Sequence, residues 1–126
     1  MALTHGNEPV GLQIFEFLQE ELKVQKLLQT GQLILVVVNP LAYQHEQRFI
    51  DHNMNRISIM PYQDESYEFE RLEQLKPLLQ KMDVVLDVHS FSSSDDQVVI
   101  CDLAHRKQCE EIFEAEVILV DKLQES

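Results

Sequence analysis

Residues 33–39 read L-I-L-V-V-V-N, an unbroken apolar run of strand length that lies between Gly31 and Pro40. No polar residue interrupts the run before Asn39, and β-branched residues dominate its second half. This composition is typical of a strand that is buried on both faces, as strands of parallel sheets covered by helices are. The run therefore predicts an α/β fold.

The sequence on either side of this run alternates between helical and strand patterns. The predicted helices cover residues 9–29, 64–81 and 103–115, and the further predicted strands cover 83–89 and 97–102. Pro77 should kink the second helix or mark a boundary in it, and residues 117–120 are too short to assign. The alternation predicts a largely parallel sheet flanked by helices. Residues 40–62 show no clean period and are predicted to be a long, partly irregular connection, a kind of loop that is usually functional.

Length and charge restrict the class of protein. A chain of 126 residues is expected to form a single domain over 1–126. Its net charge of −12, from 10 basic and 22 acidic residues, argues against nucleic acid or an anionic membrane as a partner. It contains neither a membrane-spanning apolar run nor the pattern of a signal peptide. Cys101 and Cys109 are predicted to be free thiols, which suits a cytoplasmic location.

The motif H-G-N-E at residues 5–8 contains the first pair of candidate metal ligands. His5 and Glu8 could point at one position in a short turn, because Gly6 permits backbone angles that other residues avoid. A lone H-x-x-E motif is common, however, and rarely binds a metal by itself. Solvated turn residues remain the alternative interpretation.

The run D-V-V-L-D-V-H at residues 83–89 contains a third candidate. His89 ends the predicted strand, and Asp87 lies two residues earlier on the same side of it, where it could orient the imidazole. Two imidazole nitrogens and one carboxylate oxygen form a catalytic zinc set that leaves a fourth position for water. The alternative is that His89 is a core residue with its hydrogen bonds satisfied.

The segment 39–56 places two arginines and an amide on one loop of an acidic chain. Arg48, Asn55 and Arg56 could form a local anion clamp, because guanidinium groups match carboxylates in bidentate geometry. They could equally pair with acidic neighbours such as Glu46 and Asp51 on the surface, and the sequence leaves this open.

Three motifs occur in the order of a known family. They are H-G-N-E-P-V-G, then N-P followed by R-F-I-D-H-N-M-N-R, and then D-V-H-S. In combination they resemble the succinylglutamate desuccinylase and aspartoacylase family, which is related to the zinc carboxypeptidases. The resemblance spans residues 4 to 96. It implies a zinc-carboxypeptidase-like α/β fold and hydrolysis of the amide bond of a small, anionic N-acyl amino acid.

The resemblance also implies roles for individual residues. His5, Glu8 and His89 would hold one zinc ion per chain. Arg48 would polarise the scissile carbonyl and stabilise the oxyanion. A substrate carboxylate would be bound by Asn55 and Arg56.

One role of the family has no counterpart in the motifs. The family's general base is a glutamate from a later strand, and the late acids Glu114 and Glu116 look more like solvated residues. The family's first strand and C-terminal region are not recognisable either, so the chain is expected to be a truncated member. Two alternatives follow, a zinc carboxypeptidase that acts on peptides and a truncated, non-catalytic zinc-binding domain.

Overall fold

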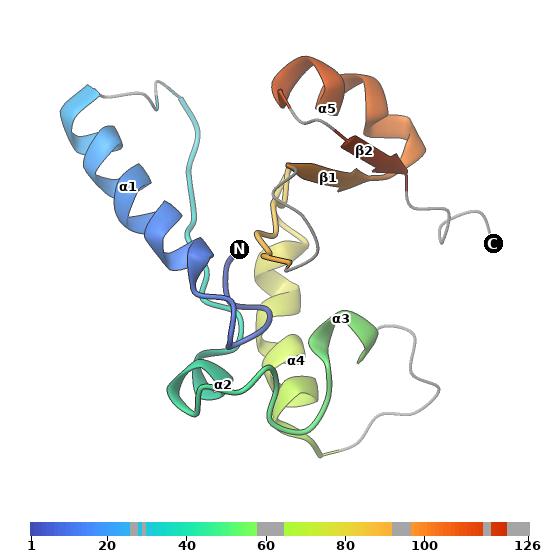
Figure 1. The fold of residues 1–126 in the computed structure, drawn as a ribbon. Coiled ribbons are helices and arrows are strands. Elements are labelled where there is room, and N and C mark those ends of the chain that lie inside the picture. The colour runs from blue at the N-terminus through green and yellow to red at the C-terminus, as the bar shows by residue number, and fades with distance from the viewer. Residues whose placement is uncertain (26–27, 29, 58–64, 92–96, 115–116, 121–126) are drawn as a thin grey trace. The chain divides into compact units, whose positions relative to one another are not determined.

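The computed structural model divides the chain into two compact units, Met1–Ser90 and Phe91–Ser126, which are described separately (Figure 1). The structure describes residues 1–25, 28, 30–57, 65–91, 97–114 and 117–120. No helix among these residues has the length and apolar character needed to cross a membrane. Both cysteines are free thiols.

The first unit contains four helices. They are α1 (Val10–Gln25), α2 (Pro40–Gln44), α3 (Met54–Ile57) and α4 (Tyr67–Leu79). The predicted helices over 9–29 and 64–81 are confirmed with shorter ends, although residues 26, 27, 29 and 64 lie outside the described residues. Pro77 lies inside the last turn of α4 and does not end it. The short helices α2 and α3 interrupt the predicted irregular connection.

The apolar core of this unit joins α3 and α4 to the end of the 33–39 run. Its buried residues are Val38, Met54, Ile57, Phe69 and Leu75. Arg71 of α4 crosses to the run, where its guanidinium donates hydrogen bonds of 2.8 Å to the carbonyls of Val37 and Val38. The core therefore fixes the position at which the run ends.

The prediction of a regular strand over 33–39 is wrong. The segment forms a single parallel bridge, in which the Ala2 N–H donates to the Val36 carbonyl and the Val38 N–H donates to the Ala2 carbonyl, both at 2.9 Å. A strand needs repeated pairing, and among the described residues only residues 1–3 supply backbone partners. The start of the run is also not buried, because Leu33 is 46% exposed.

The prediction of a strand over 83–89 is wrong for the same reason. The Met1 amine donates to the Leu86 carbonyl, and the Val88 N–H donates to the Met1 carbonyl at 3.1 Å. This is again the hydrogen-bond pattern of a parallel pair. Residues 1–3 thus pair with the end of the 33–39 run and with the end of the 83–89 run. The residues that follow these three segments therefore lie close together.

An apolar groove of about 590 Å³ opens next to these segments. Met1, α1, the end of α4 and residues 32–36 and 81–88 contribute its lining. The described residues of the lining are apolar apart from Gln32, Lys81 and Asp83.

The second unit is a small parallel β-α-β arrangement. Strand β1 (Val98–Cys101) leads through the 3₁₀ helix η1 (Leu103–His105) and helix α5 (Arg106–Ile112) to strand β2 (Val117–Val120). Val98 pairs with Val117 and Cys101 with Val120. This confirms the strand predicted over 97–102 and the helix predicted over 103–115, whose last residue lies outside the described part. A parallel sheet is therefore present, but within the described residues it has only two strands.

Candidate metal centre

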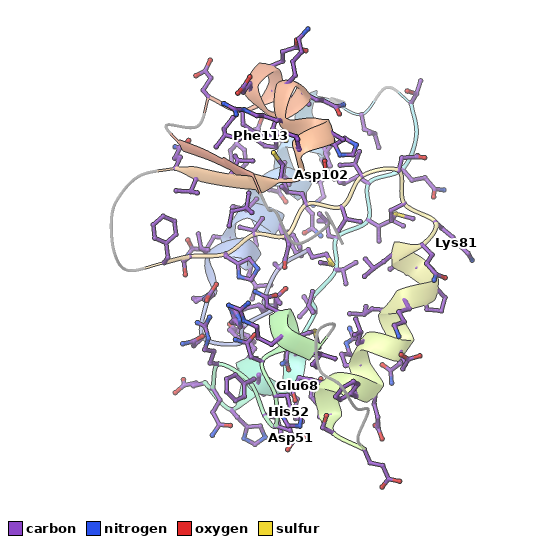
Figure 2. The ribbon with its side chains drawn as sticks, turned by 90° about the vertical axis from the view of Figure 1, so that its right-hand side faces the viewer. Asp51, His52, Glu68, Lys81, Asp102 and Phe113 are labelled. Carbon is purple, nitrogen blue, oxygen red and sulfur yellow. The ribbon has the colours of Figure 1, made fainter. Side chains whose placement is uncertain are left out.

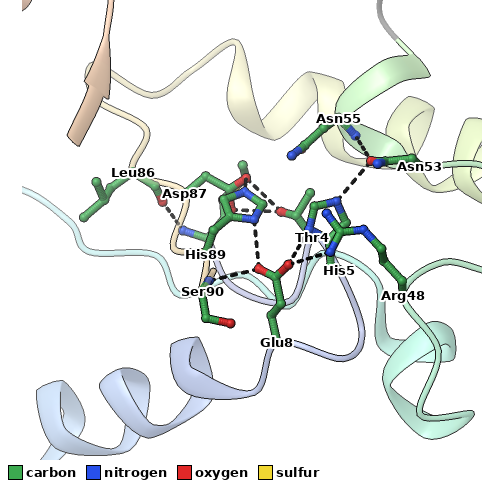
Figure 3. A network of polar contacts seen from close by, with 11 residues as sticks. Thr4, His5, Glu8, Arg48, Asn53, Asn55, Leu86, Asp87, His89 and Ser90 are labelled. Carbon is green, nitrogen blue, oxygen red and sulfur yellow. Dashed lines mark hydrogen bonds and ion pairs between the residues drawn. The ribbon is translucent and has the colours of Figure 1, made fainter. Parts of the chain in front are cut away.

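Three side chains from two distant motifs meet in the first unit. Ligand atoms of His5, Glu8 and His89 lie within 4.8 Å of one another. Nδ1 of His5 is 2.9 Å from Oε1 of Glu8, and Nδ1 of His89 is 3.1 Å from its Oε2 (Figure 3). The structure thus brings together the three residues that the sequence predicted as ligands, and the two inner imidazole nitrogens face one carboxylate.

The loop that carries His5 and Glu8 is fixed by close packing against α2. The Gly6 N–H donates to the Arg48 carbonyl at 3.0 Å. A Cβ at position 6 would lie within 2.5 Å of backbone atoms of Ala42, Tyr43 and Gln47. Gly6 does not have a positive φ, so the predicted reason for a glycine here is wrong: the position requires space and not an unusual backbone angle.

Leu3, at the entrance to this loop, has the unusual backbone angle instead. Its φ is +59° and its side chain is only 1% exposed. A branched, non-glycine residue in the left-handed region is strained by about 1–2 kcal/mol. The backbone hydrogen bonds of residues 1–3 with both apolar runs hold Leu3 in this conformation. The backbone changes direction at Leu3, and Thr4 and His5 follow it toward the candidate metal centre.

The outer nitrogen of His89 is held by Asp87. Nε2 of His89 lies 2.8 Å from Oδ2 of Asp87, and Thr4 Oγ1 donates to both Asp87 oxygens at 2.8 and 2.9 Å. The hydrogen bond with Asp87 raises the pKa of His89 despite partial burial. Burial by itself raises the pKa of Asp87, but its contacts with His89 and Thr4 outweigh this, and the net pKa is lowered. Asp87 therefore lies where the sequence predicted an orienting carboxylate.

The outer nitrogen of His5 has a partner that the sequence did not predict. Nε2 of His5 lies 3.0 Å from Oδ1 of Asn53, and this oxygen also accepts the Asn55 N–H at 3.0 Å. His5 is only 3% exposed. Asn53 lies in the middle of the 48–56 motif and directly before α3, where nothing in the sequence marks it as a partner of a histidine 48 positions earlier.

Glu8 is the centre of the network. Besides the two histidines, Oε1 accepts a hydrogen bond from Arg48 Nη1 and Oε2 accepts one from the Ser90 N–H, both at 3.0 Å. Burial by itself raises the pKa of Glu8, but the Ser90 hydrogen bond and the charges of His5 and His89 outweigh it, so the net pKa is lowered. Glu8 is therefore held as a carboxylate.

The three residues of the predicted anion clamp are placed differently from one another. Arg48 pairs with Glu8, and not with Glu46 or Asp51, while its side chain stays 47% exposed. Asn55 and Arg56 lie on α3 with exposed side chains. Among the described residues, no side-chain hydrogen bond joins Asn55 or Arg56 to the histidines. The structure brings one member of the clamp to the metal centre and leaves two facing solvent.

Glu68 organises the loop that carries these residues, and the sequence analysis missed it. Its fully buried carboxylate accepts the backbone N–H groups of Ile50, Asp51 and His52 at 2.7–3.1 Å (Figure 2). It also accepts Nδ2 of Asn39 at 3.0 Å. One signal was available, because position 68 falls at helical spacing on the face of α4 formed by Leu72, Leu75 and Leu79.

The donor set fits a zinc ion. Zinc–nitrogen and zinc–oxygen bonds of about 2.0–2.2 Å place neighbouring ligands of a tetrahedral site about 3.3 Å apart. The observed 2.9 and 3.1 Å between the histidine nitrogens and Glu8 are close to this separation. Both outer nitrogens face a hydrogen-bond acceptor, as is usual for histidines that bind a metal. Three protein ligands also leave one tetrahedral position for water or substrate.

Comparisons with known proteins identify the family of the chain. The family model described as "Succinylglutamate desuccinylase/Aspartoacylase catalytic domain" matches residues 1–119. The human N-acyl-aromatic-L-amino acid amidohydrolase (carboxylate-forming) is 29% identical over 81% of this chain and 35% of its own length. Succinylglutamate desuccinylases of Shewanella frigidimarina and Shewanella baltica are 36% identical over 42% of this chain and 16% and 15% of their own lengths.

These relatives are much longer than the chain, which spans about a third of the length of the human amidohydrolase. No solved structure matches the chain. The family match nevertheless covers nearly all of the chain, including the residues that form the candidate metal centre. The chain belongs to the succinylglutamate desuccinylase/aspartoacylase family.

Proposed function

We propose that this chain carries the metal centre of a zinc-dependent hydrolase that cleaves the amide bond of N-acyl amino acids. The observation that carries the proposal is the convergence of His5, Glu8 and His89, with the outer nitrogen of each histidine held by an acceptor. The printed names of the relatives, amidohydrolase and desuccinylase, support the reaction class.

In this proposal His5, Glu8 and His89 hold one zinc ion. A zinc ion bound there supplies Lewis-acid chemistry, because it polarises a carbonyl group and makes water a stronger nucleophile near neutral pH. Glu8 stays ionised, since Arg48 Nη1 and the Ser90 N–H donate hydrogen bonds to its two oxygens. Asp87 keeps Nδ1 of His89 directed at the centre by accepting a hydrogen bond from Nε2.

Arg48 is proposed to stabilise the negative charge that develops on the scissile carbonyl oxygen. Its Nη1 is 3.0 Å from a Glu8 oxygen, and about half of its side chain remains accessible to an incoming substrate. A preorganised cation at such a place stabilises the transition state more than the ground state.

Asn55 and Arg56 are proposed to bind the substrate carboxylate. Both lie on α3, which begins directly after Asn53, and both have exposed side chains. A chain with a net charge of −12 repels anions at long range, so an anionic substrate needs local positive charge. Arg48, Arg56 and a bound dication supply that charge.

A second candidate is a zinc-binding domain without catalytic activity. Among the described residues, the carboxylates that contact His5 or His89 are those of Glu8 and Asp87, and both already accept hydrogen bonds from other groups. Neither is free to act as the general base. Glu114 is exposed in the second unit, and Glu116 lies outside the described residues.

Zinc content tests the proposal directly. We expect elemental analysis of the purified chain to find about one zinc per molecule, and the double variant His5→Ala, His89→Ala to contain none. Removing two of three protein ligands leaves only the Glu8 carboxylate. The matched control is His45→Ala, an exposed histidine of the same unit, which should keep its zinc.

The outcomes separate the candidates. A zinc-free wild type, even after incubation with the metal, contradicts the proposed centre. One bound zinc together with hydrolysis of acetylated, succinylated or benzoylated amino acids supports the hydrolase. One bound zinc without hydrolysis of any of them favours the non-catalytic domain.

Replacing Arg48 by alanine should lower the turnover number about a hundredfold, while the zinc content stays the same. The interaction strengthens only as the oxyanion forms, so its loss affects turnover more than substrate binding. Steady-state kinetics on the best N-acyl amino acid would measure this. Arg106→Ala, which removes an exposed arginine of the second unit, is the control. An unchanged turnover number would remove Arg48 from the mechanism.

A further inference from the structure

The two cysteines of the chain meet in its second unit. Cys101 is the last residue of β1, and Cys109 lies in the middle of α5, which packs against β1 (Figure 1). A side-chain hydrogen bond joins the two thiols. Both side chains are partly exposed, so small molecules in solution can reach them. The fold therefore brings together two reactive groups that the proposed zinc site does not use.

Few apolar contacts hold the described part of the second unit together. Its parallel sheet has two strands of four residues each, and no side chain of this unit whose burial the structure describes is buried. Ile100, Leu103 and Ile112 are 63–68% exposed. Units as small as Phe91–Ser126 bury little apolar surface and commonly depend on disulfide bonds or metals for their stability. A covalent link between α5 and β1 adds stability that the described side chains do not supply.

We propose that Cys101 and Cys109 form a reversible intramolecular disulfide bond, with a low-molecular-weight disulfide such as oxidised glutathione as the oxidant. The bond fastens α5 to the end of β1. The proposal concerns the second unit alone and does not depend on the proposed zinc site of the first.

Cys109 is the attacking thiol in this reaction. Loss of contact with water, the hydrogen bond with Cys109 and the negative charge of Cys109 raise the pKa of the Cys101 thiol, so Cys101 keeps its proton. Thiolates and not thiols attack disulfides, and Cys109 therefore reacts first.

The reaction proceeds by two thiol–disulfide exchanges. The Cys109 thiolate attacks one sulfur of oxidised glutathione, the glutathione disulfide breaks, and one glutathione thiolate leaves. Cys101 then loses its proton and attacks the Cys109 sulfur, which releases the second glutathione. The two cysteines lose two electrons and two protons in total, and the glutathione disulfide gains them as it becomes two thiols.

Simple packing of two sulfur atoms is the competing explanation, because a free cysteine behaves as a small apolar side chain. The two explanations differ in the effect of folding on the disulfide. A pair held in suitable geometry oxidises more readily in the folded chain than in the unfolded chain. Unsuitable geometry strains the bond and makes oxidation of the folded chain less favourable.

The experiment equilibrates the full chain with mixtures of reduced and oxidised glutathione, in the presence of a metal chelator, in native buffer and in concentrated urea. Acid quenching, alkylation of the free thiols and mass spectrometry then measure the fraction that carries the 101–109 link. We expect the equilibrium constant for the disulfide to be about 30-fold or more larger in the folded chain than in urea, which corresponds to the stability that a disulfide typically adds. The matched controls Cys101→Ser and Cys109→Ser should each carry one glutathione and no internal link.

Two results would overturn the proposal. The first is a folded chain that keeps both thiols free, or carries glutathione without an internal bond, when oxidised glutathione is in excess. The second is an equilibrium constant in the folded chain that is equal to or smaller than the constant in urea. Both comparisons use the unmodified chain, so they apply even where a serine variant does not fold.

Hydrogen exchange followed by mass spectrometry measures the effect of the bond on the second unit. We expect the amides of β1 and α5 to exchange about tenfold or more slowly in the oxidised chain than in the reduced chain, because the bond opposes local opening. Those of α4, in the first unit, should exchange at the same rate in both and serve as the internal control. Unchanged exchange in β1 and α5 would contradict the statement that the bond fastens these two elements.

Discussion

Replacement of Gly6 by alanine is expected to lower the free energy of unfolding by about 3–5 kcal/mol. The added Cβ would lie 2.3 Å from the carbonyl carbon of Ala42, 2.4 Å from the nitrogen of Tyr43 and 2.5 Å from the carbonyl oxygen of Gln47. All three are backbone atoms, so no side chain can rotate away. Either the 4–8 loop or α2 must move, and the hydrogen bond from Gly6 to Arg48 is then lost as well.

Urea unfolding at neutral pH measures this effect, and zinc content measures its consequence for the proposed metal centre. Gly31→Ala is the matched control: its φ of +82° makes alanine strained, but no atom of the described residues lies within 4 Å of the added Cβ. We expect it to cost about 1–2 kcal/mol and to keep the zinc. If Gly6→Ala were no more costly than Gly31→Ala, the packing of the loop against α2 would be wrong.

The meeting of the two histidine motifs could be predicted from the sequence. Both motifs directly follow short segments that run in parallel, and the carboxyl ends of parallel segments lie at the same edge. The structure places His5 and His89 at such an edge, with Asp87 beside His89. The prediction depended only on the direction of the segments. It was therefore correct even though the segments are not regular strands.

The regularity itself could not be predicted from the apolar runs. β-branched residues favour an extended backbone, but a strand exists only where another segment pairs with it. Within the described part of the chain, residues 33–39 and 83–89 are paired only at their ends, by residues 1–3. Residues 117–120 were too short to assign from the sequence. They form a strand because they pair with β1 along their whole length.

The partners of Gly6, Asn53 and Glu68 could not be predicted either, because each contact joins parts of the chain that are distant in sequence. The sequence does not distinguish a glycine required for space from one required for its backbone angle. For Gly6 the packing against α2 shows that the reason is space. Glu68 was the exception in principle, since a charged residue on the apolar face of a helix needs a buried partner. Three of its four partners are backbone N–H groups, which have no sequence signature.

Replacing Glu68 by glutamine should destabilise the chain by about 3–4 kcal/mol at neutral pH. The fully buried carboxylate accepts two hydrogen bonds at each oxygen, from Asn39 and Ile50 at Oε1 and from Asp51 and His52 at Oε2. Glutamine is nearly the same size, but its NH₂ group must face two N–H donors at one of these positions. Urea unfolding measures the loss, and Glu70→Gln, an exposed neighbour on α4, is the control that should change little.

The pH dependence distinguishes a missing charge from a packing defect. Burial by itself raises the pKa of Glu68, but hydrogen bonds from Ile50, Asp51, His52 and Asn39 outweigh it, and the net pKa is lowered. A carboxyl whose folded-state pKa lies below its unfolded value of about 4.3 contributes stability that is complete above that value and is lost as the pH falls through the folded-state pKa. The difference in unfolding free energy between wild type and Glu68→Gln should therefore be constant from pH 7 to about 5 and shrink below about pH 4. A difference that stays the same down to pH 3 would mean that the shape of the side chain, and not its charge, organises the 48–56 loop.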